Sequence, residues 1–178
     1  MADGTATAST GIPPSLRLIA GLTLAFANFM VILDLTIANV SIPHIAGSLG
    51  ITLDPLTQDS CAFYENNVLI ADHGGAVVFE EQAGRDFAQA FGMNRAAIHQ
   101  NHGHFTVGST IDEAVFWFVC FERCAQAQLA AMAAGTPKHI PHESAVYTRE
   151  NAGNAITGWM HFQPLWQEIC RTDPDLFD

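Results

Sequence analysis

The sequence predicts a compact α/β domain over residues 51–178, preceded by one long apolar helix. Two observations lead to this prediction. Short apolar runs alternate with helical patterns after residue 51, and residues 18–42 are almost free of charge. At 178 residues the chain is long enough for one domain with a sizeable core. It is too short to hold a full membrane domain together with a full enzyme domain.

The first 50 residues divide into a lead-in and a long apolar segment. Residues 1–15 are small and polar, which predicts a disordered lead-in. Residues 16–50 are predicted to form a transmembrane-like helix, because the run from 18 to 42 exceeds the roughly 20 apolar residues that a span needs. Asp34 costs roughly 2.5–3.5 kcal/mol at mid-helix, which about ten apolar neighbours offset. A buried soluble helix and a secretory signal peptide are the alternatives.

The elements after residue 51 follow from hydrophobic spacing and from turn residues. They are a helix over 55–66, strands over 68–71 and 76–79, a helix over 80–91, strands over 96–99 and 105–107, and helices over 110–134 and 142–151. Residues 72–75 predict a turn, and Gly92 predicts the end of the second helix. The aromatic segment 159–166 is expected to dock on the core or on a neighbouring subunit.

The helix over 110–134 carries the clearest local signals. Thr110 and Glu113 have the spacing of a capping box, in which their side chains satisfy exposed amides of the first turn. Gly135 and Pro137 predict where the helix ends. The helix is apolar on most faces, so we expect it to pack on more than one side.

Charge and cysteine content exclude some functions. Residues 51–178 hold 16 acidic and 6 basic side chains, an excess that argues against binding nucleic acid or anionic membrane surfaces. The four cysteines form no CxxC pair, and Cys120 and Cys124 share one helical face. We expect small buried thiols rather than a metal or disulfide site.

A histidine cluster is the candidate chemical site. His99, His102 and His104 form an HxxHxH pattern, and neutral imidazole suits zinc. If one strand ran through the cluster, His102 and His104 would share a face and His99 would point away. Histidines on a surface turn are the alternative, and His73 beside two glycines fits a turn.

The apolar N-terminal segment resembles a known membrane helix. Residues 33–43 have the pattern Leu-Asp-x-Thr-Ile-x-Asn-Val-x-x-Pro. This pattern is similar to the first helix of the drug/proton antiporters of the major facilitator superfamily. The resemblance covers about 30 residues, over roughly 18–50. It implies membrane contact through residues 16–43, but one helix cannot form a transport path.

Most of the rest of the chain resembles the class II aldolase/adducin family. The matching stretches are residues 54–64, 100–108, 111–118, 121–124, 126–129 and 162–166. The resemblance implies an α/β/α layered domain, incomplete here, with a largely antiparallel sheet. It also implies chemistry in which Zn²⁺ or another divalent ion stabilises an enediolate during aldol cleavage or epimerisation. The resemblance further implies that His102 corresponds to the last metal-binding histidine of the family.

The sequence also departs from the family pattern. The family's other two metal histidines form an HxH motif upstream of the matching part, where this chain has His44 and no HxH. One imidazole cannot hold a catalytic zinc, so we expect compromised activity and assign no catalytic residue. Gln100 and His104 also replace residues that are commonly basic and apolar in the family.

Three functional hypotheses follow from these features. The first is a zinc-dependent lyase acting on a sugar phosphate or another small carbonyl compound. The second is a non-catalytic, adducin-like interaction or oligomerisation module, with a homo-oligomer implied by the family. The third is a membrane-anchored remnant of an antiporter. The protein is expected to be membrane-associated if residues 16–43 insert, and otherwise cytoplasmic like the family.

Overall fold

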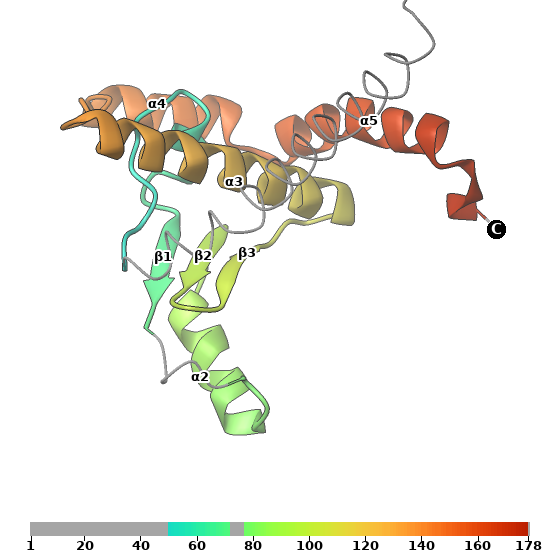
Figure 1. The fold of residues 1–178 in the computed structure, drawn as a ribbon, viewed down its shortest axis with the longest axis horizontal. Coiled ribbons are helices and arrows are strands. Elements are labelled where there is room, and N and C mark those ends of the chain that lie inside the picture. Colours follow the sequence, from blue (N-terminus) through green and yellow to red (C-terminus); the bar gives the residue numbers. More distant parts are fainter. Residues whose placement is uncertain (1–49, 72–76, 178) are drawn as a thin grey trace, which may run out of the picture. The chain divides into compact units, whose positions relative to one another are not determined.

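The computed structural model describes residues 50–71 and 77–177 (Figure 1). The predicted lead-in and nearly all of the predicted helix over 16–50 therefore lie outside the described residues, as does His73. Within the described part, no helix is both long enough and apolar enough to cross a membrane. The long apolar helix of the predicted fold thus has no counterpart among the described elements.

The described sheet has three strands and is mixed, so the prediction of a mainly antiparallel sheet needs correction. Strand β1 (Asn67–Ile70) pairs in parallel with β2 (Ala96–His99), which pairs antiparallel with β3 (Gly103–Thr106). The parallel pairing arises because helix α2 (Glu81–Phe91) lies between β1 and β2 in the chain and lets the second strand return in the same direction.

The remaining elements are mostly helical. They are η1 (Ser60–Phe63), α3 (Ile111–Ala134), α4 (His142–Ala152), α5 (Ala155–Thr172) and η2 (Pro174–Phe177). The predicted helix over 55–66 is wrong, because only one short 3₁₀ turn forms there. Residues 77–79, the described part of another predicted strand, do not form a strand.

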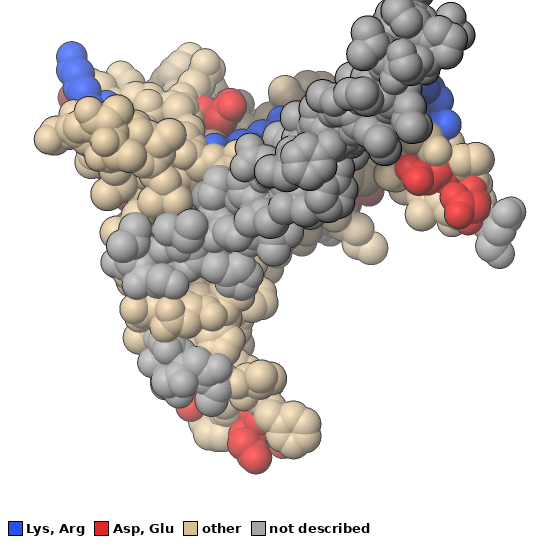
Figure 2. Space-filling model, in the orientation of Figure 1, with Lys and Arg blue, Asp and Glu red and all other residues tan. Residues whose placement is uncertain are grey.

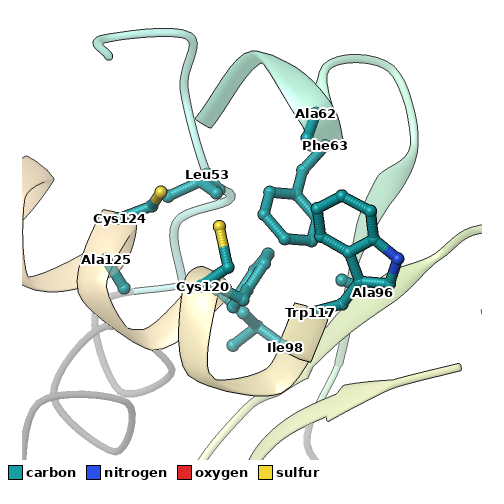
Figure 3. Close-up of a cluster of buried hydrophobic side chains, with 10 residues drawn as sticks. Leu53, Ala62, Phe63, Ala96, Ile98, Trp117, Cys120, Cys124 and Ala125 are labelled. Atoms are coloured by element: carbon teal, nitrogen blue, oxygen red, sulfur yellow. The ribbon is translucent and has the colours of Figure 1, made fainter. Parts of the chain in front are cut away.

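Helices α2 and α3 cover opposite faces of the sheet, which confirms the predicted layering. Ala96 and Ile98 of β2 join a cluster with Trp117 and Phe121 of α3 (Figure 3). Ala97, the residue between them, packs instead in a second cluster that includes two phenylalanines of α2. This alternation follows the two-residue period of a strand. The alanines are fully buried, and their small size lets both helices approach the sheet closely.

Helix α3 begins and ends as predicted. The Thr110 hydroxyl caps it by accepting a hydrogen bond from the Glu113 amide at 3.2 Å. The Glu113 carboxylate accepts from the amide of Ser109, one residue before the cap, so the capping box is shifted by one residue. At the other end the helix stops at Gly135.

Helix α5 contains the aromatic segment over 159–166 and packs against α3. The Asn154 side chain caps α5 by accepting a hydrogen bond from the Thr157 amide at 3.0 Å. Gly158 is buried where the two helices meet. The helices approach so closely there that an added Cβ would lie 2.7 Å from Glu113 Cγ. Trp159 and Trp166 stay about 40–50% exposed, so the aromatic segment packs on the core only in part.

Candidate functional site

The candidate metal histidine lies in the tight turn between β2 and β3. The amide of His102 donates to the carbonyl of His99 at 3.0 Å, and Asn101 adopts a left-handed conformation with φ of 61°. Asparagine tolerates this conformation better than most residues. The amide of Gln100 donates to the Ile70 carbonyl at 2.9 Å, which ties the turn to the end of β1. His102 therefore sits at the edge of the sheet where β1 and β2 both end.

The turn brings His99 and His102 together. Their rings stack in parallel, with centroids 4.0 Å apart and planes 10° apart. Phe87 of α2 packs on His99 with ring centroids 5.3 Å apart. His99 is 2% exposed, and His102 is partly buried. The predicted arrangement with His99 pointing away is therefore wrong, because the chain reverses at Asn101 rather than continuing as one strand.

His104 lies apart from this pair and packs toward α3. Its ring stacks on Phe118 and Phe121, with centroids 3.9 and 5.4 Å away. Its Nε2 is 3.3 Å from the Phe118 carbonyl oxygen, in hydrogen-bonding range. In β3 it pairs with Ile98, whose side chain belongs to the α3 cluster. His104 is thus a core residue, and the HxxHxH pattern does not converge on one point.

A catalytic zinc takes three protein ligands and keeps one position open. Across residues 50–71 and 77–177, no group of three or more His, Cys, Asp or Glu side chains is placed to hold a metal ion. The stacked pair His99 and His102 supplies two imidazoles at most. The described residues therefore do not complete a metal site by themselves.

A small cavity of about 200 Å³ lies beside the stacked pair. His99 lines it together with Ile70, Asp86 and Phe87 from the neighbouring strand and helix. The lining is mostly apolar. This cavity has room for a small molecule next to His99, but it offers few polar groups to orient one.

A charged network, which the sequence did not reveal, connects the start of α3 with η1 and with the junction of α4 and α5. Glu113 is 5% exposed and accepts hydrogen bonds from the Ser109 amide (2.6 Å), the Ser109 hydroxyl (2.7 Å) and Trp117 Nε1 (3.1 Å). The Arg95 guanidinium lies 4.5 Å from the centre of the Trp117 ring. Arg95 also donates to the carbonyls of Ala62 and Gly153, both at 2.7 Å.

The network shifts the titration of both charged groups. Burial acts to raise the pKa of Glu113, but the hydrogen bonds from Ser109 and Trp117 and the charge of Arg95 outweigh it, so this pKa lies below its usual value. Burial lowers the pKa of Arg95 despite the nearby Glu113. The only signal in the sequence was the capping spacing of Glu113, and nothing there singled out Arg95.

The cysteines match the prediction in large part. None of the four, all of which the structure describes, forms a disulfide. Cys61, Cys120 and Cys124 are buried, and Cys170 is partly exposed. A hydrogen bond with Cys124 and burial both raise the pKa of the Cys120 thiol, which keeps it protonated.

Comparison with known proteins places the chain in a family. The model described as "Class II Aldolase and Adducin N-terminal domain" matches residues 27–129, more than half of the chain. The chain is 40% identical over 124 residues to the decarboxylase NovR of Streptomyces niveus, covering 70% of this chain and 46% of that protein. It is 39% identical over 124 residues to a 4-hydroxy-3-prenylphenylpyruvate oxygenase/4-hydroxy-3-prenylbenzoate synthase of Streptomyces roseochromogenus subsp. oscitans, covering 70% of this chain and 44% of that protein. The chain thus spans about half the length of these relatives.

Solved structures agree with this assignment. An L-fuculose 1-phosphate aldolase from Glaciozyma antarctica PI12 matches with a TM-score of 0.65 and 36% identity, over 75% of this chain and 50% of that one. An aldolase II superfamily protein from Pseudomonas syringae matches with a TM-score of 0.67 over 77% of this chain and 56% of that one. Its 24% identity makes it a match of fold alone.

The family match also corrects the reading of the N-terminal segment. It begins at residue 27, upstream of the point near residue 52 where the sequence resemblance started. Residues 27–50, which resemble an antiporter helix, therefore fall inside the aldolase-family match, and the antiporter resemblance is not supported. The chain belongs to the class II aldolase/adducin family.

Proposed function

We propose that this protein takes part in breaking or forming a carbon–carbon bond next to a carbonyl group, as a divalent-metal-dependent lyase. The substrate would be a sugar phosphate or another small hydroxy-carbonyl compound. Two matched proteins bear the names of an aldolase and a decarboxylase, and both of these reactions break a carbon–carbon bond. The proposal assigns His102 as one metal ligand and leaves the catalytic acid or base unassigned.

The placement of His102 carries the proposal. The turn holds its imidazole against His99 at the end of the sheet, and neutral imidazole is a common ligand of zinc and related ions. Stacking on His99 limits the rotation of the ring, which lowers the entropic cost of binding a metal. Because His99 and His102 cannot complete a catalytic site, the proposal requires further ligands outside the described residues or from a second subunit.

Metal content tests the role of His102 directly. The full chain, equilibrated with zinc and separated from free metal, is expected to retain about one zinc per chain, as one catalytic site requires. His102→Ala should lose this zinc. His139→Ala is the matched control, because His139 is exposed and lies on a different segment, near Asp54. Equal zinc in the His102→Ala variant and in the wild type would remove His102 from the proposed site.

Two compounds distinguish the substrate classes. L-Fuculose 1-phosphate represents the sugar phosphates, and 4-hydroxy-3-prenylphenylpyruvate represents the aromatic keto acids named for one relative. Zinc-loaded protein should split L-fuculose 1-phosphate into two carbonyl products by aldol cleavage. 4-Hydroxy-3-prenylphenylpyruvate has no hydroxyl group β to its keto group, so its cleavage would be a decarboxylation that releases CO₂, with O₂ supplied as the oxidant in a parallel assay. The His102→Ala variant should show none of these activities. Zinc bound without turnover of either compound would count against a lyase acting on these two classes.

A non-catalytic interaction module is the second candidate function. Helix α5 and η2 expose several large apolar side chains, among them Ile156, Trp159, Met160 and Phe177. In Figure 2 acidic and basic side chains are visible at this end of the chain, so the exposed apolar side chains lie among charged ones. Such surfaces often mark protein contacts. If α5 contacts a second subunit, Ile156→Glu should lower the mass measured by light scattering, whereas the control Gln167→Glu should leave it unchanged.

A further inference from the structure

A second and larger cavity opens between η1, α3 and α5. Its volume is about 430 Å³, within the range of small-molecule sites. The buried side chains of Trp117 and Cys120 form part of its lining. Figure 3 shows both residues on α3, close to Ala62 of η1. Phe116 and His161 stack with their ring centroids 5.1 Å apart and line another part. The cavity therefore offers flat aromatic surface to a ligand.

Two opposite charges also line this cavity, namely Asp59 and Arg123. Asp59 is the N-cap residue of η1, but its side chain makes no capping hydrogen bond. The other arginines of the described part all bond to carboxylate, amide or carbonyl oxygens. The guanidinium of Arg123 has no hydrogen bond or ion pair within residues 50–71 and 77–177. Both charges are thus available to a ligand.

The charges of Asp59 and Arg123 both influence the pKa of the Cys120 thiol. The pKa of the Cys120 thiol is raised mainly by its hydrogen bond with Cys124 and by burial. The Asp59 carboxylate adds to this increase in pKa, whereas the Arg123 guanidinium opposes it. Asp59 and Arg123 line the same cavity as this thiol, so the cavity offers charges of both signs to a ligand. Phe116 and Trp117 define its apolar part.

We propose that this cavity binds a small zwitterion, namely an α-amino acid with an aromatic side chain. Its carboxylate would pair with Arg123, its ammonium group with Asp59, and its ring would pack on Phe116 and Trp117. A carboxylic acid without an amine would leave Asp59 facing an anion, and an amine without a carboxylate would leave Arg123 facing a cation. The lining therefore favours a ligand that carries both charges. No lining residue is shared with the His99–His102 pair, so this site is separate from the proposed lyase site.

Calorimetry with three related probes tests the proposal on the full chain. L-Phenylalanine carries both charges, 3-phenylpropionate carries only the acid, and phenethylamine carries only the amine. L-Phenylalanine should bind saturably, and the other two should bind at least about tenfold more weakly, the loss expected for one charge-assisted contact. Saturable binding of none of the three at millimolar concentration would overturn the proposal, as would equal affinity for 3-phenylpropionate and L-phenylalanine.

Single substitutions locate the site. Arg123→Gln and Asp59→Asn should each weaken L-phenylalanine binding by about tenfold. The matched controls Arg171→Gln and Asp175→Asn remove exposed charges elsewhere and should leave the affinity unchanged. Val119→Phe places a ring into the cavity lining and should abolish binding. Binding that survives both charge substitutions unchanged would show that the ligand lies elsewhere.

Discussion

The buried carboxylate of Glu113 gives the sharpest prediction about stability. Replacing it with glutamine keeps its size but removes its charge and one acceptor oxygen. Ser109 and Trp117 each point an N–H group at the carboxylate, at 2.6 and 3.1 Å. A glutamine side chain can accept from only one of them, because its NH₂ group must face the other. One buried donor is therefore left unsatisfied in either orientation.

The magnitude follows from these contacts. An unsatisfied buried donor costs about 1–3 kcal/mol, and replacing charge-assisted hydrogen bonds by neutral ones costs about 1 kcal/mol more. We expect Glu113→Gln to lower the free energy of unfolding at pH 7 by about 2–4 kcal/mol, a large share of the 5–15 kcal/mol of a typical domain. Urea unfolding followed by circular dichroism measures this difference.

The dependence on pH tests the same contacts independently. The pKa of Glu113 is lower in the folded protein than in the unfolded chain. The stabilisation from its charge is therefore complete above the unfolded pKa of about 4.3 and is lost as the pH falls through the folded pKa. The difference between wild type and Glu113→Gln should shrink as the pH is lowered from 7 to about 3.5.

The exposed Glu168, which pairs with Arg171 on the surface of α5, provides the control. Glu168→Gln should change the free energy of unfolding by less than about 0.5 kcal/mol. The reasoning fails if Glu113→Gln costs no more than Glu168→Gln. It also fails if the cost of Glu113→Gln stays constant over the whole pH range.

Three further predictions concern helix packing, the partly buried Arg95 guanidinium and the thiols. Gly158→Ala should destabilise the fold by about 1–3 kcal/mol, because its Cβ would lie 2.7 Å from Glu113 Cγ. The helical control Gly84→Ala should stabilise it by about 0.5–1 kcal/mol, because no atom lies within 4 Å of its added Cβ, and urea midpoints measure both. Arg95→Lys should cost about 2 kcal/mol in the same assay, because an ammonium group cannot reproduce the two guanidinium bonds to separate carbonyls. A thiol-specific disulfide reagent should label Cys170 quickly in the native protein and the three buried cysteines only after urea is added.

Elements with strong local signals were predicted well. The helix over 110–134 matches α3 because its cap at Thr110 and its stop at Gly135 lie within the segment itself. The strand over 96–99 matches β2 residue for residue. In both cases short-range chemistry and burial favour the same structure, so no distant contact was needed to identify it.

The helix predicted over residues 55–66 does not form, because side chains there compete for the hydrogen bonds of the backbone. Residues 55–66 have helical spacing, but Thr57 and Ser60 bond to each other through both hydroxyls and both amides. These local hydrogen bonds replace those of a continuous helix, and only the short turn η1 remains. The Asn67 side chain also accepts a hydrogen bond from the Leu53 amide, which fixes the chain just before this segment.

The candidate site could be predicted only in part. The family resemblance identified His102, but spacing could not show that the chain reverses at Asn101 and stacks His102 on His99. That reversal depends on one residue in the left-handed region and on the register between β2 and β3. The aromatic cavity with Asp59 and Arg123 was also missed, because its lining comes from segments far apart in the sequence.

The Arg95 guanidinium has a consequence for how the protein opens. It holds the carbonyls of Ala62 and Gly153, which lie 33 and 58 residues away along the chain. If either carbonyl moves away, the partly buried guanidinium loses one of its two carbonyl partners, so a local opening at one end weakens the contacts at the other. Amide hydrogens near η1 and at the junction of α4 with α5 should therefore exchange with solvent at a common rate, as one cooperative unit spanning more than half of the described sequence.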